Sequence, residues 1–82
     1  MSNSRSQVLK AFGQLIRRRR QALEISQEEF GYRAGLDRTY VSGLERGVRN
    51  PSLTALVSLA QGFGISVSDL AAHLEKEMEN AE

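Results

Sequence analysis

The chain has 82 residues, which is enough for one domain around a single core and too few for two. Hydrophobic residues make up 40% and charged residues 26% of the sequence, an ordinary globular composition that argues against intrinsic disorder. The absence of cysteine excludes a disulfide framework and a thiolate metal site. The polar N-terminus and the lack of a long apolar run predict a cytoplasmic protein without membrane contact.

The net charge of +1 hides an uneven distribution of charge along the chain. Residues 1–50 carry ten basic and five acidic side chains, a net charge of +5, whereas residues 51–82 carry one basic and five acidic side chains, a net charge of −4. Such asymmetry is typical of a half that faces a polyanion joined to a half with another role.

Apolar periodicity and frequent stop signals predict five short helices and no strands. The first helix is expected over about Val8–Leu23, after a flexible N-terminus at residues 1–6. Ser26 and Glu29 have the spacing of a capping box, in which each side chain satisfies a backbone N–H at the start of the second helix. Gly35 is expected to end that helix in the left-handed conformation.

The second half of the chain continues with three more helices. Asp37 is a natural cap for the third helix, which is expected over residues 37–46. Ser52 is placed to cap the fourth helix and Ser66 the fifth. The fifth helix fades into an acidic tail at residues 77–82, which has little apolar surface and is expected to fray. The folded domain is therefore predicted over residues 7–76.

The second and third predicted helices form a helix-turn-helix pattern. Gly31 lies in the middle of a helix, where glycine costs about 1 kcal/mol relative to alanine, so we expect the third helix to approach closely there. Apolar positions that would lock and dock the pair are Phe30, Ala34, Leu36, Val41 and Leu44. A helical hairpin without a ligand is the plainer alternative.

Two segments, ISQEEF at residues 25–30 and LERG at residues 44–47, carry a resemblance that extends over nearly the whole chain. The chain resembles the lambda-repressor-like DNA-binding domains of the phage repressor and Cro type. Within that family, LDRTYVSGLERGVRNP at residues 36–51 is similar to the controller proteins of restriction-modification systems, which are short stand-alone dimers. The resemblance implies a compact, all-α, five-helix fold and a transcription regulator, repressor or activator, that binds double-stranded DNA in the bacterial nucleoid.

The third predicted helix would then be the recognition helix, with its first turn in the major groove. Base contacts are expected from Arg38, Thr39, Ser42 and Gly43. Arg38 is the first choice, because a guanidinium can bond O6 and N7 of guanine together. The alternative interpretation is that Arg38 is a solvated surface residue that binds nothing. Gly43 departs from the longer polar side chains that phage repressors often place there, which shifts readout towards the first turn and DNA shape.

Several polar side chains around the helix pair are expected to hold the DNA backbone. Gln27 resembles the family glutamine that binds a phosphate, assisted by the amides at a helix N-terminus. The other expected backbone contacts are Tyr40, Arg46, Arg49, Asn50 and Arg33. Simple solvation is the alternative for the arginines at and beyond the end of the helix.

Residues 17–20 are four successive arginines, which point in four directions on a helix and cannot act as one patch. By the family's pattern, Arg20 lies on the inner face and pairs with Glu45, which would orient the recognition helix. The remaining arginines are expected to be mainly solvated and to add general attraction to DNA.

One recognition helix contacts few base pairs, so we expect a homodimer on a pseudo-palindromic operator with half-sites about 10 base pairs apart. The resemblance places the dimer contact in the C-terminal part. The apolar residues expected there are Phe63, Ile65, Val67, Leu70 and Leu74. RNA polymerase is a further candidate partner, because an operator near a promoter would block or recruit it.

An enzyme is not expected from this sequence, which has one histidine, no glycine-rich phosphate loop and no inward-facing carboxylate pair. No metal, cofactor or small-molecule ligand is evident. The main competing interpretation is an antitoxin-type regulator that also binds a partner protein. RNA binding is a third possibility, disfavoured because A-form RNA closes off its major groove.

Overall fold

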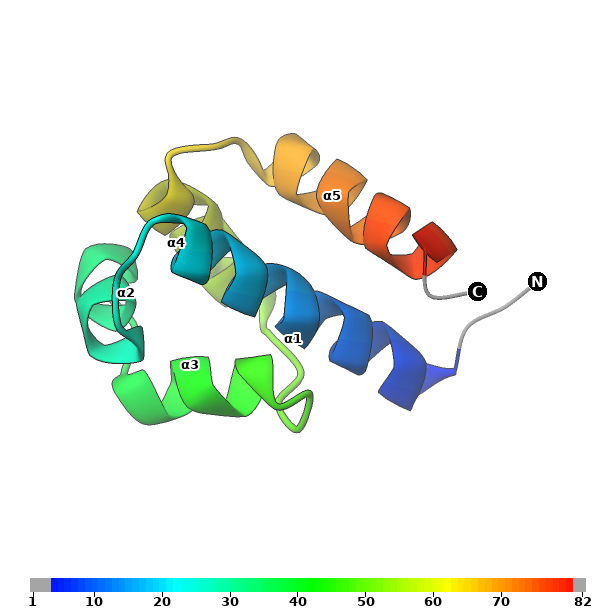
Figure 1. Ribbon diagram of the computed structural model, residues 1–82, viewed down its shortest axis with the longest axis horizontal. Helices are drawn as coiled ribbons and strands as arrows, with labels where there is room; N and C mark the ends of the chain where they lie inside the picture. The colour runs from blue at the N-terminus through cyan, green and yellow to red at the C-terminus, as the bar shows by residue number, and fades with distance from the viewer. Residues whose placement is uncertain (1–3, 81–82) are drawn as a thin grey trace.

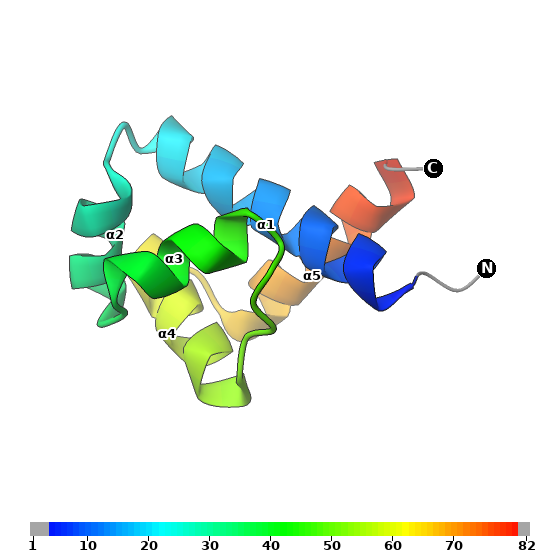
Figure 2. The same ribbon diagram turned by 90° about the horizontal axis from the view of Figure 1, so that it is seen from below.

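The computed structural model describes residues 4–80 and contains five α-helices, with no strand in that range. They are α1 (Arg5–Ala22), α2 (Gln27–Ala34), α3 (Arg38–Glu45), α4 (Leu53–Phe63) and α5 (Val67–Asn80). Helix α1 runs through the middle of the molecule, with α3 along one side of it and α5 along the other (Figure 1). Seen from below, α3 crosses in front and the loop after it leads to α4 (Figure 2). The predicted all-α, five-helix fold is confirmed.

One apolar core receives side chains from all five helices. Its buried members are Phe12, Leu15, Ile16, Phe30, Ala34, Val41, Leu44, Leu59, Ala60 and Leu70. Phe30 is fully buried and stacks on Phe63, with the ring centroids 4.3 Å apart and the planes 22° from parallel. Burial of each large side chain contributes about 1.5–3 kcal/mol, so the core holds the helix-turn-helix against α1 and α4.

Helix α1 begins at Arg5, three residues before the predicted start. Ser4 and Gln7 form a complete capping box: the Gln7 N–H donates to the Ser4 hydroxyl at 3.2 Å, and the Ser4 N–H donates to Gln7 Oε1 at 2.9 Å. Of the segment at residues 1–6 that was predicted to be flexible, Ser4 is the helix cap and Arg5 and Ser6 are helical, and the first three residues lie outside the described range.

The capping box predicted at α2 forms only in part. The Glu29 N–H donates to the Ser26 hydroxyl at 3.0 Å, as expected. The Glu29 carboxylate instead accepts from Arg33 Nε at 3.1 Å, one helical turn later. A cation four residues further on competes with the cap N–H for this carboxylate, because both are within reach on an exposed helix surface.

The acidic C-terminal segment is ordered further than predicted, because α5 continues to Asn80. Glu77 is buried and forms an ion pair with Arg18 on α1. Leu70, Leu74 and Met78, four residues apart, continue one partly or fully buried stripe along α5. Residues 77–80, where fraying was predicted, are therefore helical, and residues 81–82 lie outside the described range.

No single helix within residues 4–80 is long and apolar enough to cross a membrane. Helices α4 and α5 together meet that test by length and composition, but they are bent by 95° relative to each other.

Candidate nucleic-acid interface

The turn between α2 and α3 depends on two glycines. Gly35 has φ of +70°, a left-handed conformation that ends α2. The Leu36 N–H donates to the Gly31 carbonyl at 2.8 Å, which closes the turn. A Cβ at Gly31 would lie 2.5 Å from the Leu36 carbonyl oxygen. The close approach predicted at Gly31 is therefore made by the turn itself, just before α3 begins.

Asp37 fixes the start of α3. Its Oδ1 accepts the Thr39 N–H at 2.8 Å and the Thr39 hydroxyl at 2.5 Å. These hydrogen bonds, the hydroxyl one first, lower the pKa of Asp37 below its ordinary value. A charged carboxylate at the N-terminal end of α3 also interacts favourably with the helix dipole. The first turn of α3 is therefore held in place before any ligand arrives.

Helix α3 presents a polar face outward while Val41 and Leu44 enter the core. Arg38 and Thr39 are exposed at its first turn. Ser42, one turn later, is half-buried, and its hydroxyl accepts a bond from Arg46 Nε at 3.4 Å. The exposed first turn is where the recognition side chains are expected to lie.

Gly43 is not open to a ligand, contrary to the prediction that it contacts bases. It is buried beneath Arg49: a Cβ placed on it would collide with Arg49 Cγ and lie 3.3 Å from Cδ. The Arg49 guanidinium lies 4.9 Å from the centroid of the Tyr40 ring. A side chain from the loop after α3 therefore covers the middle of the recognition helix, an arrangement that helical periodicity alone does not reveal.

A buried carboxylate ties α3 to α1. Glu45, whose side chain is 0% exposed, accepts from Arg20 Nε at 2.6 Å and from Arg20 Nη2 at 3.0 Å. Arg17 Nε and Gln27 Nε2 add bonds at 3.3 Å and 3.0 Å. Arg20 Nη1 also donates to the Ile25 carbonyl at 2.9 Å. The expected Arg20–Glu45 pair is thus the centre of a larger cluster that orients α3.

Burial acts to raise the pKa of Glu45, but the hydrogen bonds and charges around it act the other way. The bonds from Arg20, Gln27 and Arg17, with the charge of Arg20, outweigh burial and hold the pKa below its usual value. The carboxylate is therefore ionised at neutral pH. Gln27 was expected to contact phosphate; its amide nitrogen is instead engaged with Glu45, and the side chain is half-buried.

The four successive arginines at residues 17–20 of α1 divide into two pairs. Arg17 and Arg20 bond to Glu45 on α3, as described above. Arg18 pairs with Glu77 on α5, and the Arg19 guanidinium lies 5.8 Å from the centroid of the Phe63 ring. Arg17 and Arg18 keep 49% and 60% of their side chains exposed, as expected for mainly solvated residues. Their contacts with acids far away in sequence, and that of Arg19 with Phe63, were not expected.

A shallow hollow of about 390 Å³ lies beside the first turn of α3. Thr39, Tyr40 and Arg49 line it, together with hydroxyl groups near the start of α4, among them Ser52 and Thr54. The sequence identified Ser52 only as a helix cap. The N-terminus of α4, which Ser52 caps, lies close to α3 because of the path of the loop between α3 and α4.

The apolar residues predicted for a dimer contact are largely engaged within one chain. Leu70 is 2% exposed and belongs to the core, so its assignment to an interface is wrong. Phe63, Ile65 and Leu74 are half-buried and pack against the core. Val67 is the exposed member of the set, at 38%.

The remaining predicted contacts, Arg33, Arg46, Arg49 and Asn50, are all exposed. Residues 16–70 match the helix-turn-helix family. The chain belongs to the helix-turn-helix family. That match contains α2, the turn and α3 and extends into α5.

Several relatives of this helix-turn-helix protein are controller proteins. It is 42% identical over 67 residues to the control protein C.MunI of a Mycoplasma species, covering 80% of this chain and 90% of that protein. The crystal structure of the restriction-modification controller protein C.AhdI from Aeromonas hydrophila matches with a TM-score of 0.72 and 45% identity, covering 76% of this chain and 94% of that chain.

The controller protein C.Esp1396I has also been solved as a tetramer in complex with its natural 35 base-pair operator. That structure matches with a TM-score of 0.80 and 32% identity, over 88% of this chain and 95% of that chain. The predicted resemblance to restriction-modification controllers is confirmed.

Proposed function

We propose that this protein is a sequence-specific, double-stranded DNA-binding transcription regulator, not an enzyme, and that it controls a restriction-modification operon as a homodimer. The observation that carries this proposal is the exposed first turn of α3, capped by Asp37 and anchored through Glu45. A similar controller solved on its operator supports the same use of the fold. An operator near a promoter would also bring the protein to the nucleoid and into contact with RNA polymerase.

Base readout is assigned to the outer side chains of the recognition helix. Arg38 can bond O6 and N7 of guanine, a pairing worth about 1–3 kcal/mol of discrimination. The Thr39 hydroxyl proton is already donated to Asp37, so Thr39 offers a base its methyl group and an acceptor oxygen. Ser42 completes the set at the second turn.

The phosphate backbone would be held around this helix by Tyr40, Arg33, Arg46, Arg49 and Asn50, and by Gln27 through the amide proton that it does not donate to Glu45. Arg49 lies across α3, so it would also lie close to the bases in the DNA major groove that α3 would enter. The Ser52 and Thr54 hydroxyls hydrogen-bond to each other, so one of their two protons remains to donate to a phosphate beside the N-terminus of α4.

Replacing Arg38 with alanine is expected to weaken operator binding by about ten- to a hundredfold, because the guanidinium contacts bases as well as adding charge. Binding to random DNA should fall much less. Gel-shift titrations of both DNAs measure the two affinities at one salt concentration. Arg5→Ala, which removes an exposed arginine at the start of α1, is the matched control. Equal losses on operator and random DNA would contradict base reading by Arg38.

We propose that the dimer contact is formed by apolar side chains that remain exposed in the single chain. Leu53 and Val57 lie one turn apart on α4, at 74% and 40% exposure, and Val67 begins α5. Contiguous exposed apolar surface is typical of interaction sites, and Leu53 with Val57 forms an adjacent pair of this kind on one face of α4. A second copy that covers them would satisfy the two-fold symmetry expected of a pseudo-palindromic operator.

Replacing Val57 with aspartate is expected to produce a folded monomer, because the charge enters the subunit contact and not the core. Sedimentation at micromolar concentration measures the mass, and thermal unfolding followed by circular dichroism measures the fold. Leu70→Asp is the contrasting variant and should unfold the chain, since Leu70 is buried within it. A Val57→Asp protein that stays dimeric would place the interface elsewhere.

Selection of bound duplexes from a random DNA pool tests the proposed function as a whole. The expected result is a pseudo-palindrome whose half-site centres lie about 10 base pairs apart. Recovery of unrelated sequences, or of sites without symmetry, would contradict specific binding by a dimer.

A further inference from the structure

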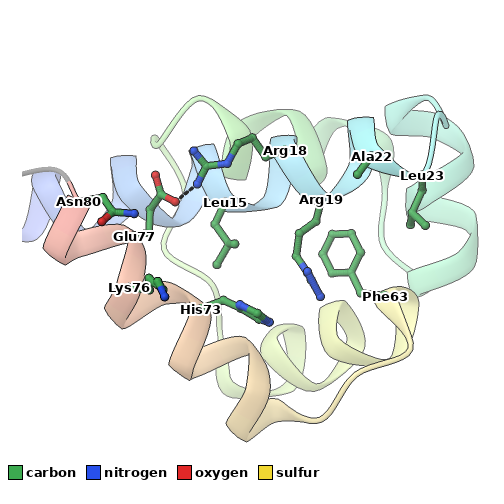
Figure 3. A pocket seen from close by; sticks show the side chains of 10 residues that line it. All are labelled: Leu15, Arg18, Arg19, Ala22, Leu23, Phe63, His73, Lys76, Glu77 and Asn80. Carbon is green, nitrogen blue, oxygen red and sulfur yellow. Dashed lines mark ion pairs between the residues drawn. The ribbon is translucent and has the colours of Figure 1, made fainter.

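A groove lies between α1 and α5. Helix α5 is on the opposite side of α1 from the recognition helix α3 (Figure 1). The volume of the groove is about 520 Å³, within the range of small-molecule sites. The view in Figure 3 shows side chains from α1, α5 and the end of α4 that surround it. A DNA duplex held against α3 would not reach this side of the molecule, so the DNA-binding role does not explain the groove.

The polar lining of the groove is mainly basic. Arg18, Arg19 and Lys76 line it together with His73, whereas Glu77 is its one acidic residue and is already paired with Arg18. Arg19 and His73 point toward each other from opposite walls, with no acidic side chain labelled between them (Figure 3). Such an arrangement favours a negatively charged group between the two walls.

Arg19 has a buried donor without a partner. Its Nε is inaccessible to solvent and makes no hydrogen bond to any atom of the described chain. A buried N–H on a charged group is costly to leave unpaired, and native proteins satisfy almost all such groups. The Arg19 guanidinium rests over the Phe63 ring, which keeps it within the groove.

The other lining of the groove is apolar. Leu15 and Phe63 form its inner part, and Ala22 and Leu23 lie toward one end, where Leu23 remains 45% exposed. An apolar wall beside the Arg19 guanidinium fits a ligand with an apolar body and one anionic end.

We propose that the α1–α5 groove binds a small amphiphilic anion, with its carboxylate or sulfonate at Arg19 and His73 and its apolar body against Leu15, Phe63 and Leu23. Because Arg19 Nε is closed to solvent, the anion would pair with the other N–H groups of the Arg19 guanidinium, which lines the groove. This site is separate from the DNA-binding surface and from the exposed apolar residues assigned to the dimer.

The experiment uses two fluorescent probes that share one apolar body. Anilinonaphthalene sulfonate carries the negative charge, and N-phenylnaphthylamine has the same rings without it. Titration into the folded full-length protein should give an affinity at least about tenfold higher for the sulfonate, the value of one charge-assisted hydrogen bond. Chemical shift changes on sulfonate binding should centre on Leu15, Phe63 and His73.

Arg19→Gln should lower sulfonate affinity by about tenfold and leave the neutral probe unchanged. Arg33→Gln, which removes an exposed arginine on α2, is the matched control and should change neither. If Arg19→Gln fails to fold, Leu23→Asp removes an apolar contact of both probes and adds a charge that repels the sulfonate at the exposed rim of the groove, so it should lower sulfonate affinity more than that of the neutral probe. Equal affinity for the two probes, unchanged binding by these variants, or shifts centred elsewhere would overturn the proposal.

Discussion

Replacing Glu45 with glutamine is expected to lower the free energy of unfolding by about 3 kcal/mol. The Glu45 side chain is 0% exposed and that of Arg20 only 14%, so the substitution leaves a largely buried guanidinium without its counter-charge. For a domain of this size, the melting temperature should fall by at least about 12 °C. Thermal unfolding at neutral pH, followed by circular dichroism, measures this change.

Glu29→Gln is the matched control for Glu45→Gln. Glu29 also accepts from an arginine at 3.1 Å, but both side chains of that pair are about half exposed. Water screens the charges and solvates either partner alone, so the cost should stay below about 0.5 kcal/mol. Similar losses for the two variants would show that burial does not set the strength of the Glu45 cluster.

The buried Arg20–Glu45 pair also predicts how the free energy of unfolding depends on pH. The pKa of Glu45 in the folded protein lies below its ordinary value of 4.5. Its contribution is therefore fully present above the unfolded pKa and is lost as pH falls below that value, through the lower pKa of the folded state. Between about pH 5 and pH 3, unfolding free energy should fall more steeply for the wild type than for Glu45→Gln. Parallel curves would contradict a lowered pKa for Glu45.

Replacing Gly13 with alanine is expected to destabilise the protein by about 2 kcal/mol, although alanine is the better helix former. Helices α1 and α3 touch at this point through their backbones. A Cβ on Gly13 would collide with the Leu44 carbonyl oxygen and lie 2.7 Å from that of Glu45. Neither atom is the end of a flexible side chain, so the two helices would have to separate, and the Arg20–Glu45 bonds would lengthen.

Urea unfolding of Gly13→Ala and of Gln14→Ala measures this effect. Gln14 is the next residue of α1 and is exposed, so its replacement should change unfolding free energy by less than about 0.5 kcal/mol. A stabilised Gly13→Ala protein would show that helix propensity outweighs the close approach of α1 and α3.

The sequence was sufficient for the features that local rules govern. Helix number follows from apolar spacing and from caps such as Asp37, whose bond to the Thr39 N–H the structure contains. The left-handed turn at Gly35 likewise depends on nearby residues only. The Arg20–Glu45 contact spans two helices, and it was anticipated from family resemblance and not from spacing.

Features that depend on long-range packing could not be predicted in this way. Helical periodicity places Gly43 on the outer face of α3, but it contains no information about the Arg49 side chain that folds back over it. An apolar residue near the C-terminus, such as Leu70, looks the same in sequence whether it fills the core or a subunit contact. The acidic end of α5 was expected to be solvated and unpaired, because the partner of Glu77, Arg18, lies on another helix.

The position of Arg49 bears on the entropy of association. A free arginine must lose side-chain freedom when it binds, at a cost of about 0.5–1.5 kcal/mol. Here the side chain already rests over Gly43 and on the Tyr40 ring in the unbound protein. Part of that ordering therefore occurs during folding and not during association, so the surface that would meet DNA is preorganised by a residue outside the recognition helix.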